Sequence, residues 1–358
     1  MSSKSKARAP ILAITLGCPA GVGPEVALGA FAAHRSTWAA KSKGARAGAP
    51  RLLFIGDANI LAEAARLLNL DDAIRVCSEP SEIASLGPTD LAVYGGSARV
   101  DGAFVAGEPN AACGAAQFAW IRTGAELVMS GLCDALVTAP VSKAAIASSG
   151  VPNARSFRGH TEYLAELTGA QHAVMAFYSK ALVTSLATTH LPLSKVAKAV
   201  TEESVASATY WLACLLTKLE PKRVPRIAVA SLNPHAGEDG LLGKEERTAI
   251  APGITLAEKR LAKEKQKAII VGPIGAETAL RKAVRTEDAS YDGVVAMYHD
   301  QATIASKVLS FGDAVNVTLG LPIVRTSVDH GTGYDVAWTG KADPSGMIEA
   351  IALAVRML

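Results

Sequence analysis

Aromatic residues are scarce in this chain of 358 residues, since Phe, Trp and Tyr together make up only 5% of it. Proteins that bind single-stranded nucleic acid usually stack the bases on aromatic side chains, and proteins that bind duplexes usually carry a strong basic patch. The formal net charge here is only +3. The composition therefore argues against a nucleic-acid-binding protein.

A long apolar run and a cysteine framework are also missing. No run reaches the roughly 18 apolar residues that a membrane-spanning helix needs, so we expect no membrane segment. The five cysteines are scattered, odd in number and without any CxxC pair, which argues against a zinc ribbon and a disulfide framework. We therefore expect reduced thiols and a cytoplasmic protein.

The chain does contain short apolar runs that alternate with helical patterns. The runs are rich in Val, Ile and Leu and are bounded by Gly, Pro, Asn or Asp, which is typical of strands buried on both faces. Strand, helix and strand in repetition predict an α/β protein with mainly parallel sheets and helices on both faces. The predicted strands lie in residues 11–17, 51–57, 135–141, 173–179, 182–189, 226–233, 267–273, 293–299 and 314–320.

Three of the predicted strands run directly onto a histidine. These are His190 in SLATTHLP, His235 in ASLNPHAGE and His299 in VVAMYHDQ. A lone histidine at a strand end is usually an ordinary hydrogen-bonding residue. Because the carboxyl ends of parallel strands share one edge of a sheet, however, three imidazoles there could bind one catalytic metal ion and leave a position open. Asp300 and Glu238 follow two of them closely and could orient these ligands.

A second group of side chains could hold an anion. The segment FRGHTE places Arg158 close to His160 and Thr161. The glycine-rich turn in residues 16–25 could also hold an anion at a helix start, although a plain strand-to-helix turn explains it equally well. A fixed Lys or Arg matches phosphate or carboxylate, but one cation alone is usually surface charge. Around the later strands lie Lys307, Asn316 and Arg325.

Several longer motifs occur in a fixed order along the chain. They are TAPVSKAAI, GHTEYLAELTG, TTHLPL, LNPHAGE, AMYHDQ and NVTLGLPIVRTSVDHGT. Together they closely resemble the 4-hydroxythreonine-4-phosphate dehydrogenase family of pyridoxal phosphate biosynthesis, and the resemblance covers nearly the whole chain. The closing HGTGYDVAWTGKADP is similar to the cofactor loop of isocitrate and isopropylmalate dehydrogenases.

The resemblance implies the two-lobed fold of the isocitrate and isopropylmalate dehydrogenases. One α/β lobe is expected to comprise residues 1–135 and 310–358, with both termini and the cofactor loop. The other is expected to comprise residues 136–309, with the metal-binding histidines and the dimerisation surface. The resemblance also implies a homodimer whose active sites are built from both subunits.

The resemblance further implies roles for individual residues. One divalent ion (Zn, Mg, Mn or Co) would bind His190, His235 and His299. The implied substrate residues are His160, Thr161, Lys307, Asn316 and Arg325. NAD, or NADP, would bind at Asp329, His330, Gly331, Thr332 and Asp335. The general base stays unidentified, with Lys307 and Asp300 as candidates.

The implied reaction oxidises the C3 hydroxyl of 4-phosphooxy-L-threonine, a small phosphorylated hydroxy acid. The resulting β-keto acid then loses carbon dioxide and gives 3-amino-2-oxopropyl phosphate. The metal would stabilise the alkoxide, and the cationic residues would hold the phosphate and the carboxylate. Two positions depart from the usual family pattern: Cys18 replaces an acidic residue, and Glu277 in GPIGAETAL replaces an aspartate.

Three alternatives stay open. Related dehydrogenases act on 4-phospho-D-threonate or 4-phosphoerythronate, and more distant ones act on aromatic cis-dihydrodiols, but Lys307, Asn316 and Arg325 favour a phosphorylated substrate. A phosphotransacetylase-like transferase is disfavoured because acyl transfer needs no site of three histidines. A non-enzymatic binding protein would show neither metal dependence nor NADH formation.

Overall fold

The structure is a computed structural model that describes residues 8–41, 49–310 and 312–358. The chain divides into two compact units. Unit 1 comprises Met1–Gly169, Pro322–Arg356 and Leu358, and unit 2 comprises Ala170–Leu321 with Met357. No described helix is long and apolar enough to cross a membrane.

Unit 1 contains six parallel strands in the order β3-β4-β2-β1-β5-β12. Every residue of β1, β2 and β5 is buried, as expected for strands covered on both faces. The strands are β1 (Ile11–Thr15), β2 (Arg51–Ile55), β3 (Arg75–Cys77), β4 (Ala92–Tyr94), β5 (Ala135–Thr138) and β12 (Val324–Val328).

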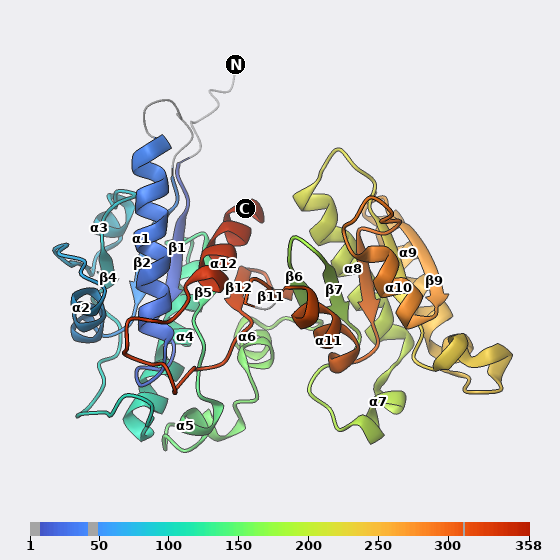
Figure 1. The fold of residues 1–358 in the computed structure, drawn as a ribbon, viewed down its shortest axis with the longest axis horizontal. Coiled ribbons are helices and arrows are strands. Elements are labelled where there is room, and N and C mark those ends of the chain that lie inside the picture. Colours follow the sequence, from blue (N-terminus) through green and yellow to red (C-terminus); the bar gives the residue numbers. More distant parts are fainter. Residues whose placement is uncertain (1–7, 42–48, 311) are drawn as a thin grey trace. The chain divides into compact units, whose positions relative to one another are not determined.

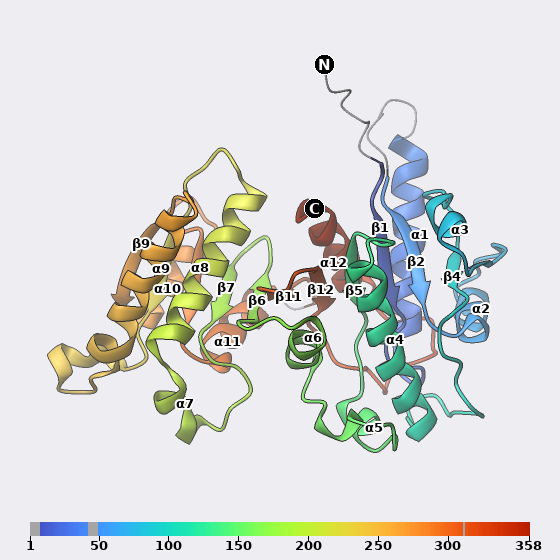
Figure 2. The same cartoon turned by 180° about the vertical axis from the view of Figure 1, so that it is seen from behind.

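Helices cover both faces of the sheet of unit 1. Helix α1 lies in front of the strands in Figure 1 and packs on α2 and α12, whereas α4 lies in front in the reverse view of Figure 2 and packs on β1 and β5. The helices are α1 (Gly23–Lys41), α2 (Ala58–Leu67), α3 (Pro80–Ala84), α4 (Ala111–Met129), α5 (Lys143–Ala147), the 3-10 turn η1 (Ala154–Ser156), α6 (His160–Thr168) and α12 (Ser345–Arg356).

Unit 2 contains a mixed sheet in the order β11-β6-β7-β10-β8-β9. Its β11–β6 and β6–β7 pairs are antiparallel, and the remaining pairs are parallel. The strands are β6 (Val174–Tyr178), β7 (Val183–Leu186), β8 (Arg226–Ala230), β9 (Ile269–Ile274), β10 (Gly293–Ala296) and β11 (Val315–Leu319).

Helices again lie on both faces of this sheet. Helices α10 and α11 lie in front in Figure 1, and α8 and α9 lie in front in Figure 2. The helical segments are α7 (Leu193–Ala199), α8 (Glu202–Leu219), η2 (Pro234–Gly240), η3 (Glu246–Ile250), α9 (Ala251–Lys263), α10 (Ala276–Ala283) and α11 (His299–Leu309).

The predicted α/β class with mainly parallel strands and helices on both faces is confirmed, and each of the nine predicted segments contains a strand. The predicted division at 135/136 and 309/310 differs from the observed units. Helices α5 and α6 pack on α4, which assigns the chain to unit 1 as far as Gly169, and β11 pairs with β6, which keeps it in unit 2. Tertiary packing sets these bounds.

Candidate active site

Arg325 is the most deeply buried of the predicted substrate residues. It lies on β12, is 2% exposed, and donates from Nη2 to Thr138 Oγ1 at the end of β5, 2.7 Å away. Burial lowers the pKa of Arg325 to about 9, while the nearby Glu162 carboxylate acts in the opposite direction. At neutral pH this guanidinium is therefore a fixed, desolvated cation, which is suited to bind an anion.

His160 and Thr161 open helix α6 in the same unit. Burial lowers the pKa of His160 well below its usual value, and the charges of Arg325 and Lys143 lower it further, so the imidazole is neutral at pH 7. Its Nε2 atom is buried and has no hydrogen-bond partner among the described residues. Buried polar atoms normally have a partner, so an unpaired one next to Arg325 indicates a place for a ligand.

Lys143 joins this group, since its charge acts on His160, although no role for it was predicted from the sequence. It is the first residue of α5, after the N-cap Ser142. Its Nζ atom lies 3.7 Å from the place where a Cβ atom on Gly159 would lie. The motif TAPVSKAAI contains this lysine, but spacing alone could not place it beside residue 159.

The predicted cofactor residues all lie in the loop of residues 329–344 that follows β12. Val22 donates to the carbonyl of Thr332 over 2.9 Å, which fixes this loop against the β1–α1 turn. His330 Nε2 is buried and has no hydrogen-bond partner among the described residues, whereas Asp335 is exposed. The loop therefore contains both a buried nitrogen without a partner among the described residues and an exposed carboxylate.

Cys18, at the unusual position in the glycine-rich turn, packs against this loop. Its Sγ atom lies 3.6 Å from the hydroxyl of Tyr334, and burial raises the pKa of the thiol. Cys18 is therefore a neutral, fully buried group at pH 7. Glu277, the other departure, is exposed at the start of α10, where it pairs with Arg281 at 3.3 Å.

Two of the three predicted metal ligands lie together in unit 2. His190 follows β7, and His299 begins α11 directly after β10, the strand next to β7. Their ring centroids are 5.3 Å apart. His299 Nδ1 lies 2.7 Å from an oxygen of Asp300, so Nε2 is the ring nitrogen that could bind a metal.

The third predicted ligand, His235, lies in an unusual turn. Residues 235–239 all have a positive φ, between 44° and 82°, which is rare for residues other than glycine. The buried carboxylate of Glu246 holds the approach to this turn, accepting from Leu232 N at 3.0 Å and Asn233 N at 2.8 Å. Among the described residues no three His, Cys, Asp or Glu side chains gather closely enough to hold a metal ion.

The remaining predicted residues also lie in unit 2. Lys307 is exposed on α11, Asn316 is half-buried on β11, and Asp300 is exposed at the start of α11. The structure identifies neither Lys307 nor Asp300 as the base. The structure thus groups His160, Thr161 and Arg325 in unit 1 and His190 with His299 in unit 2.

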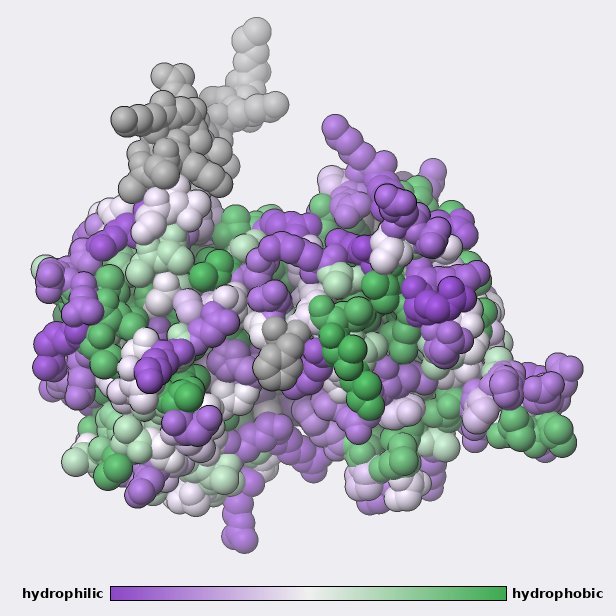
Figure 3. All heavy atoms as spheres, viewed as in Figure 1, coloured by the Kyte–Doolittle hydropathy of each residue, from purple (hydrophilic) through white to green (hydrophobic). Residues whose placement is uncertain are grey.

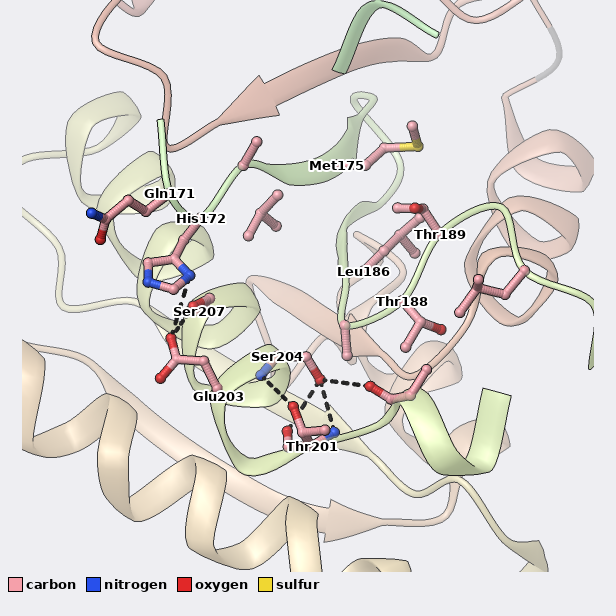
Figure 4. A pocket seen from close by; sticks show the side chains of 15 residues that line it. Gln171, His172, Met175, Leu186, Thr188, Thr189, Thr201, Glu203, Ser204 and Ser207 are labelled. Carbon is pink, nitrogen blue, oxygen red and sulfur yellow. Dashed lines mark hydrogen bonds and ion pairs between the residues drawn. The ribbon is translucent and has the colours of Figure 1, made fainter. Parts of the chain in front are cut away.

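A pocket of about 410 Å³ lies in unit 2 beside α8 (Figure 4), and it is also lined by Thr188, Thr189 and Leu191, which flank His190. On the side of the helix, Thr201 and Ser204 form a capping box at the start of α8. Glu203 accepts a hydrogen bond from Ser207 at 2.9 Å and pairs with His172 at 3.6 Å. These contacts stabilise the helix start, so we do not assign the reaction to this pocket.

Known proteins similar to this chain share nearly its full length. A family model described as "Pyridoxal phosphate biosynthetic protein PdxA" matches residues 49–354. The 4-hydroxythreonine-4-phosphate dehydrogenase of Caulobacter vibrioides is 40% identical over 352 residues, which is 97% of each chain. The enzyme of the same name from Acidithiobacillus ferrooxidans is 40% identical, over 98% of this chain and 96% of the relative.

Several solved structures are also similar to this chain over nearly its full length. The crystal structure of 4-hydroxythreonine-4-phosphate dehydrogenase from Klebsiella pneumoniae has a TM-score of 0.76 at 34% identity, covering 98% of this chain and 99% of that one. A terephthalate 1,2-cis-dihydrodiol dehydrogenase from Burkholderia xenovorans has a TM-score of 0.63 at 26% identity over 98% of both chains. The EutD phosphotransacetylase from Staphylococcus aureus, at 14% identity and a TM-score of 0.52 over 98% and 94% of the chains, shares the fold alone.

Proposed function

Because the chain belongs to the family of pyridoxal phosphate biosynthetic proteins called PdxA, we propose that it is a 4-hydroxythreonine-4-phosphate dehydrogenase, an oxidoreductase. Its substrate is 4-phosphooxy-L-threonine, and NAD or NADP accepts the hydride. The structural observation that carries the proposal is the group of Arg325, His160 and Thr161, where a buried cation lies next to an imidazole nitrogen without a partner.

The proposed reaction has two steps. Hydride leaves C3 for the nicotinamide ring while the C3 hydroxyl loses its proton to a base, which gives a β-keto acid and a reduced cofactor. The bond between C2 and the carboxylate then breaks, carbon dioxide leaves, and the electron pair remains on the enolate until C2 takes up a proton. The product is 3-amino-2-oxopropyl phosphate.

Residues of unit 1 bind and orient the substrate in this proposal. Arg325 holds an anionic group of the substrate, since its guanidinium is fixed by Thr138. His160 is neutral, so it can donate one hydrogen bond from a ring nitrogen or accept one. A fixed anion keeps C3 at one distance from the nicotinamide, and such positioning is a large part of rate acceleration.

The donors in unit 2 fit a divalent ion chemically, because imidazole and carboxylate suit Zn, Mn, Co or Mg. His190 and His299 would hold it with His235, and a bound ion would supply a Lewis acid for the C3 hydroxyl. Metal binding requires neutral imidazoles, and the contact of His299 with Asp300 orients one of them.

We also propose that the protein is a cytoplasmic homodimer. Helix α11 carries exposed apolar side chains at Ile304 (65%), Val308 (81%) and Leu309 (41%). They form a hydrophobic area over α11 in Figure 3. Large exposed apolar patches often mark protein interfaces, and a second copy of the chain would bury this one.

One experiment tests the proposed function. The metal-loaded protein is offered 4-phosphooxy-L-threonine and 4-phospho-D-threonate in parallel, with and without a chelator, and NADH formation is measured. We expect chelator-sensitive turnover that strongly prefers the amino acid. A preference for phosphothreonate would keep the mechanism but change the substrate, and no turnover of either would contradict the proposal.

A further inference from the structure

We infer that Glu25 is a positioning residue for the nicotinamide cofactor, because its carboxylate fixes the loop of residues 329–344 through two backbone amides. Glu25 lies in the first turn of α1 and is 2% exposed. One carboxylate oxygen accepts from Gly340 N at 2.7 Å, and the other accepts from Trp338 N. The inference rests on the proposed function, which places the cofactor at this loop.

The two amides that Glu25 binds belong to residues with left-handed backbone conformations. Trp338 has a φ of 60° and Gly340 a φ of 72°. A bulky residue with positive φ is strained and persists only where its surroundings hold it. For Trp338 the indole supplies a further contact, since its Nε1 donates to Pro19 O over 2.8 Å. Glu25 therefore holds a strained double turn together.

Several contacts attach the loop to the β1–α1 segment, among them the Cys18–Tyr334 contact and the indole bond of Trp338 to Pro19 O. Two further attachments lie on either side of Asp335. Thr332 accepts from Val22 N at 2.9 Å, and Glu25 binds Trp338 and Gly340 further along. Asp335 lies between these attachments and is exposed, so both attachments determine how its carboxylate is presented. Loss of the Glu25 contacts would leave the anchored start of the loop in place but weaken the hold on the later part, where the indole bond of Trp338 to Pro19 O would remain.

A matched control exists in the same unit. Asp57 is also a buried carboxylate, 6% exposed, and it accepts from Asn59 N at 2.8 Å and Val100 N at 3.0 Å. It caps α2, and its two amide partners lie outside the loop of residues 329–344. Replacing either acid with its amide removes one acceptor from a pair of buried N–H groups, so the two variants should lose similar stability.

The test compares Glu25→Gln with Asp57→Asn. NADH binding is measured directly by fluorescence in the absence of substrate, together with the KM for NAD, the KM for the phosphorylated substrate, and Tm. For Glu25→Gln we expect the Kd for NADH and the KM for NAD to rise about tenfold, with an unchanged substrate KM. For Asp57→Asn we expect a similar drop in Tm and unchanged NADH binding.

Four outcomes would overturn the inference or its premise. Equal NADH affinity in Glu25→Gln and wild type would make Glu25 merely structural, and so would an equal loss in Asp57→Asn. If Glu25→Gln does not fold, Glu25→Asp serves instead, because the shorter acid keeps the charge but cannot reach both amides, and intact NADH affinity there would again reject the role. If wild-type protein binds no NADH, the proposed function itself fails.

Discussion

The proposed substrate residues of unit 1 and the proposed metal-binding histidines of unit 2 differ in how firmly the fold fixes their side chains. Arg325 is 2% exposed and hydrogen-bonded to Thr138. In unit 2, His190 and His235 are exposed, and only His190 lies beside His299. The proposed anion site is therefore fixed by folding itself, because Arg325 lies on β12 beside β5, where Thr138 holds its guanidinium, whereas the histidine set depends on a strained turn.

The largest expected effect concerns the exposed turn of unit 2. Replacing His235 with Ala should lower metal affinity by more than about 100-fold, since even residues that only support ligands cost 10–100-fold. The variant should still fold, because His235 is exposed. Metal content by elemental analysis and circular dichroism check both parts, and full metal content with full turnover would show that His235 is not a ligand.

The next effect concerns the buried cation of unit 1. We expect Arg325→Met to lose about 2–5 kcal/mol of substrate binding, as is usual when one partner of a buried charged pair is removed. The measurement is the substrate KM at saturating NAD, with Arg226→Met on the exposed start of β8 as the control. An unchanged KM would remove Arg325 from the anion site.

The pKa of Arg325, about 9, adds a pH dependence to the same site. The protonated guanidinium binds the anion, so substrate affinity should be present below about pH 9 and fall as the pH rises through that value. Arg325→Lys keeps a cation with a different titration and should shift the pH at which affinity falls. An affinity that stays constant up to pH 11 would contradict the lowered pKa.

A smaller effect is expected at Glu246 in unit 2, whose carboxylate holds the approach to the strained turn. Glu246→Gln keeps the shape but weakens the bonds to the amides of Leu232 and Asn233, so it should cost about 1–3 kcal/mol of unfolding free energy. It should also lower metal affinity by about 10–100-fold. Urea unfolding and metal titration measure the two effects. Lost stability with unchanged metal affinity would show that Glu246 does not influence metal binding at His235.

The smallest effect is a dependence of stability on pH from His160. Its pKa is lowered in the folded protein, so below about pH 6.5 the unfolded chain binds a proton that the folded chain does not. Stability should therefore fall as the pH decreases below that value, by up to about 1.4 kcal/mol per pH unit. His160→Gln should flatten this dependence, and an identical slope in both proteins would mean that His160 does not titrate in this way.

The amino-acid sequence determined the class of fold and the candidate residues of this protein. The strands ILAIT and VMAFY are buried on both faces, so they are almost continuously apolar in the sequence. Such short apolar runs predict strands. Strands β3, β4 and β12 went unpredicted. The three residues of β3 and of β4 carry too little periodicity, and β12 (VRTSV) is not an apolar run. The ordered motifs also led to the correct family.

Only the tertiary structure decided which residues meet. In the folded chain Lys143 lies beside Gly159, and the carboxylate of Glu25 accepts from the amides of Trp338 and Gly340. His235 does not join the pair of His190 and His299. These relations join residues far apart in the chain. They depend on strand register, helix packing and backbone strain, and none of these leaves a local pattern that spacing in the sequence could reveal.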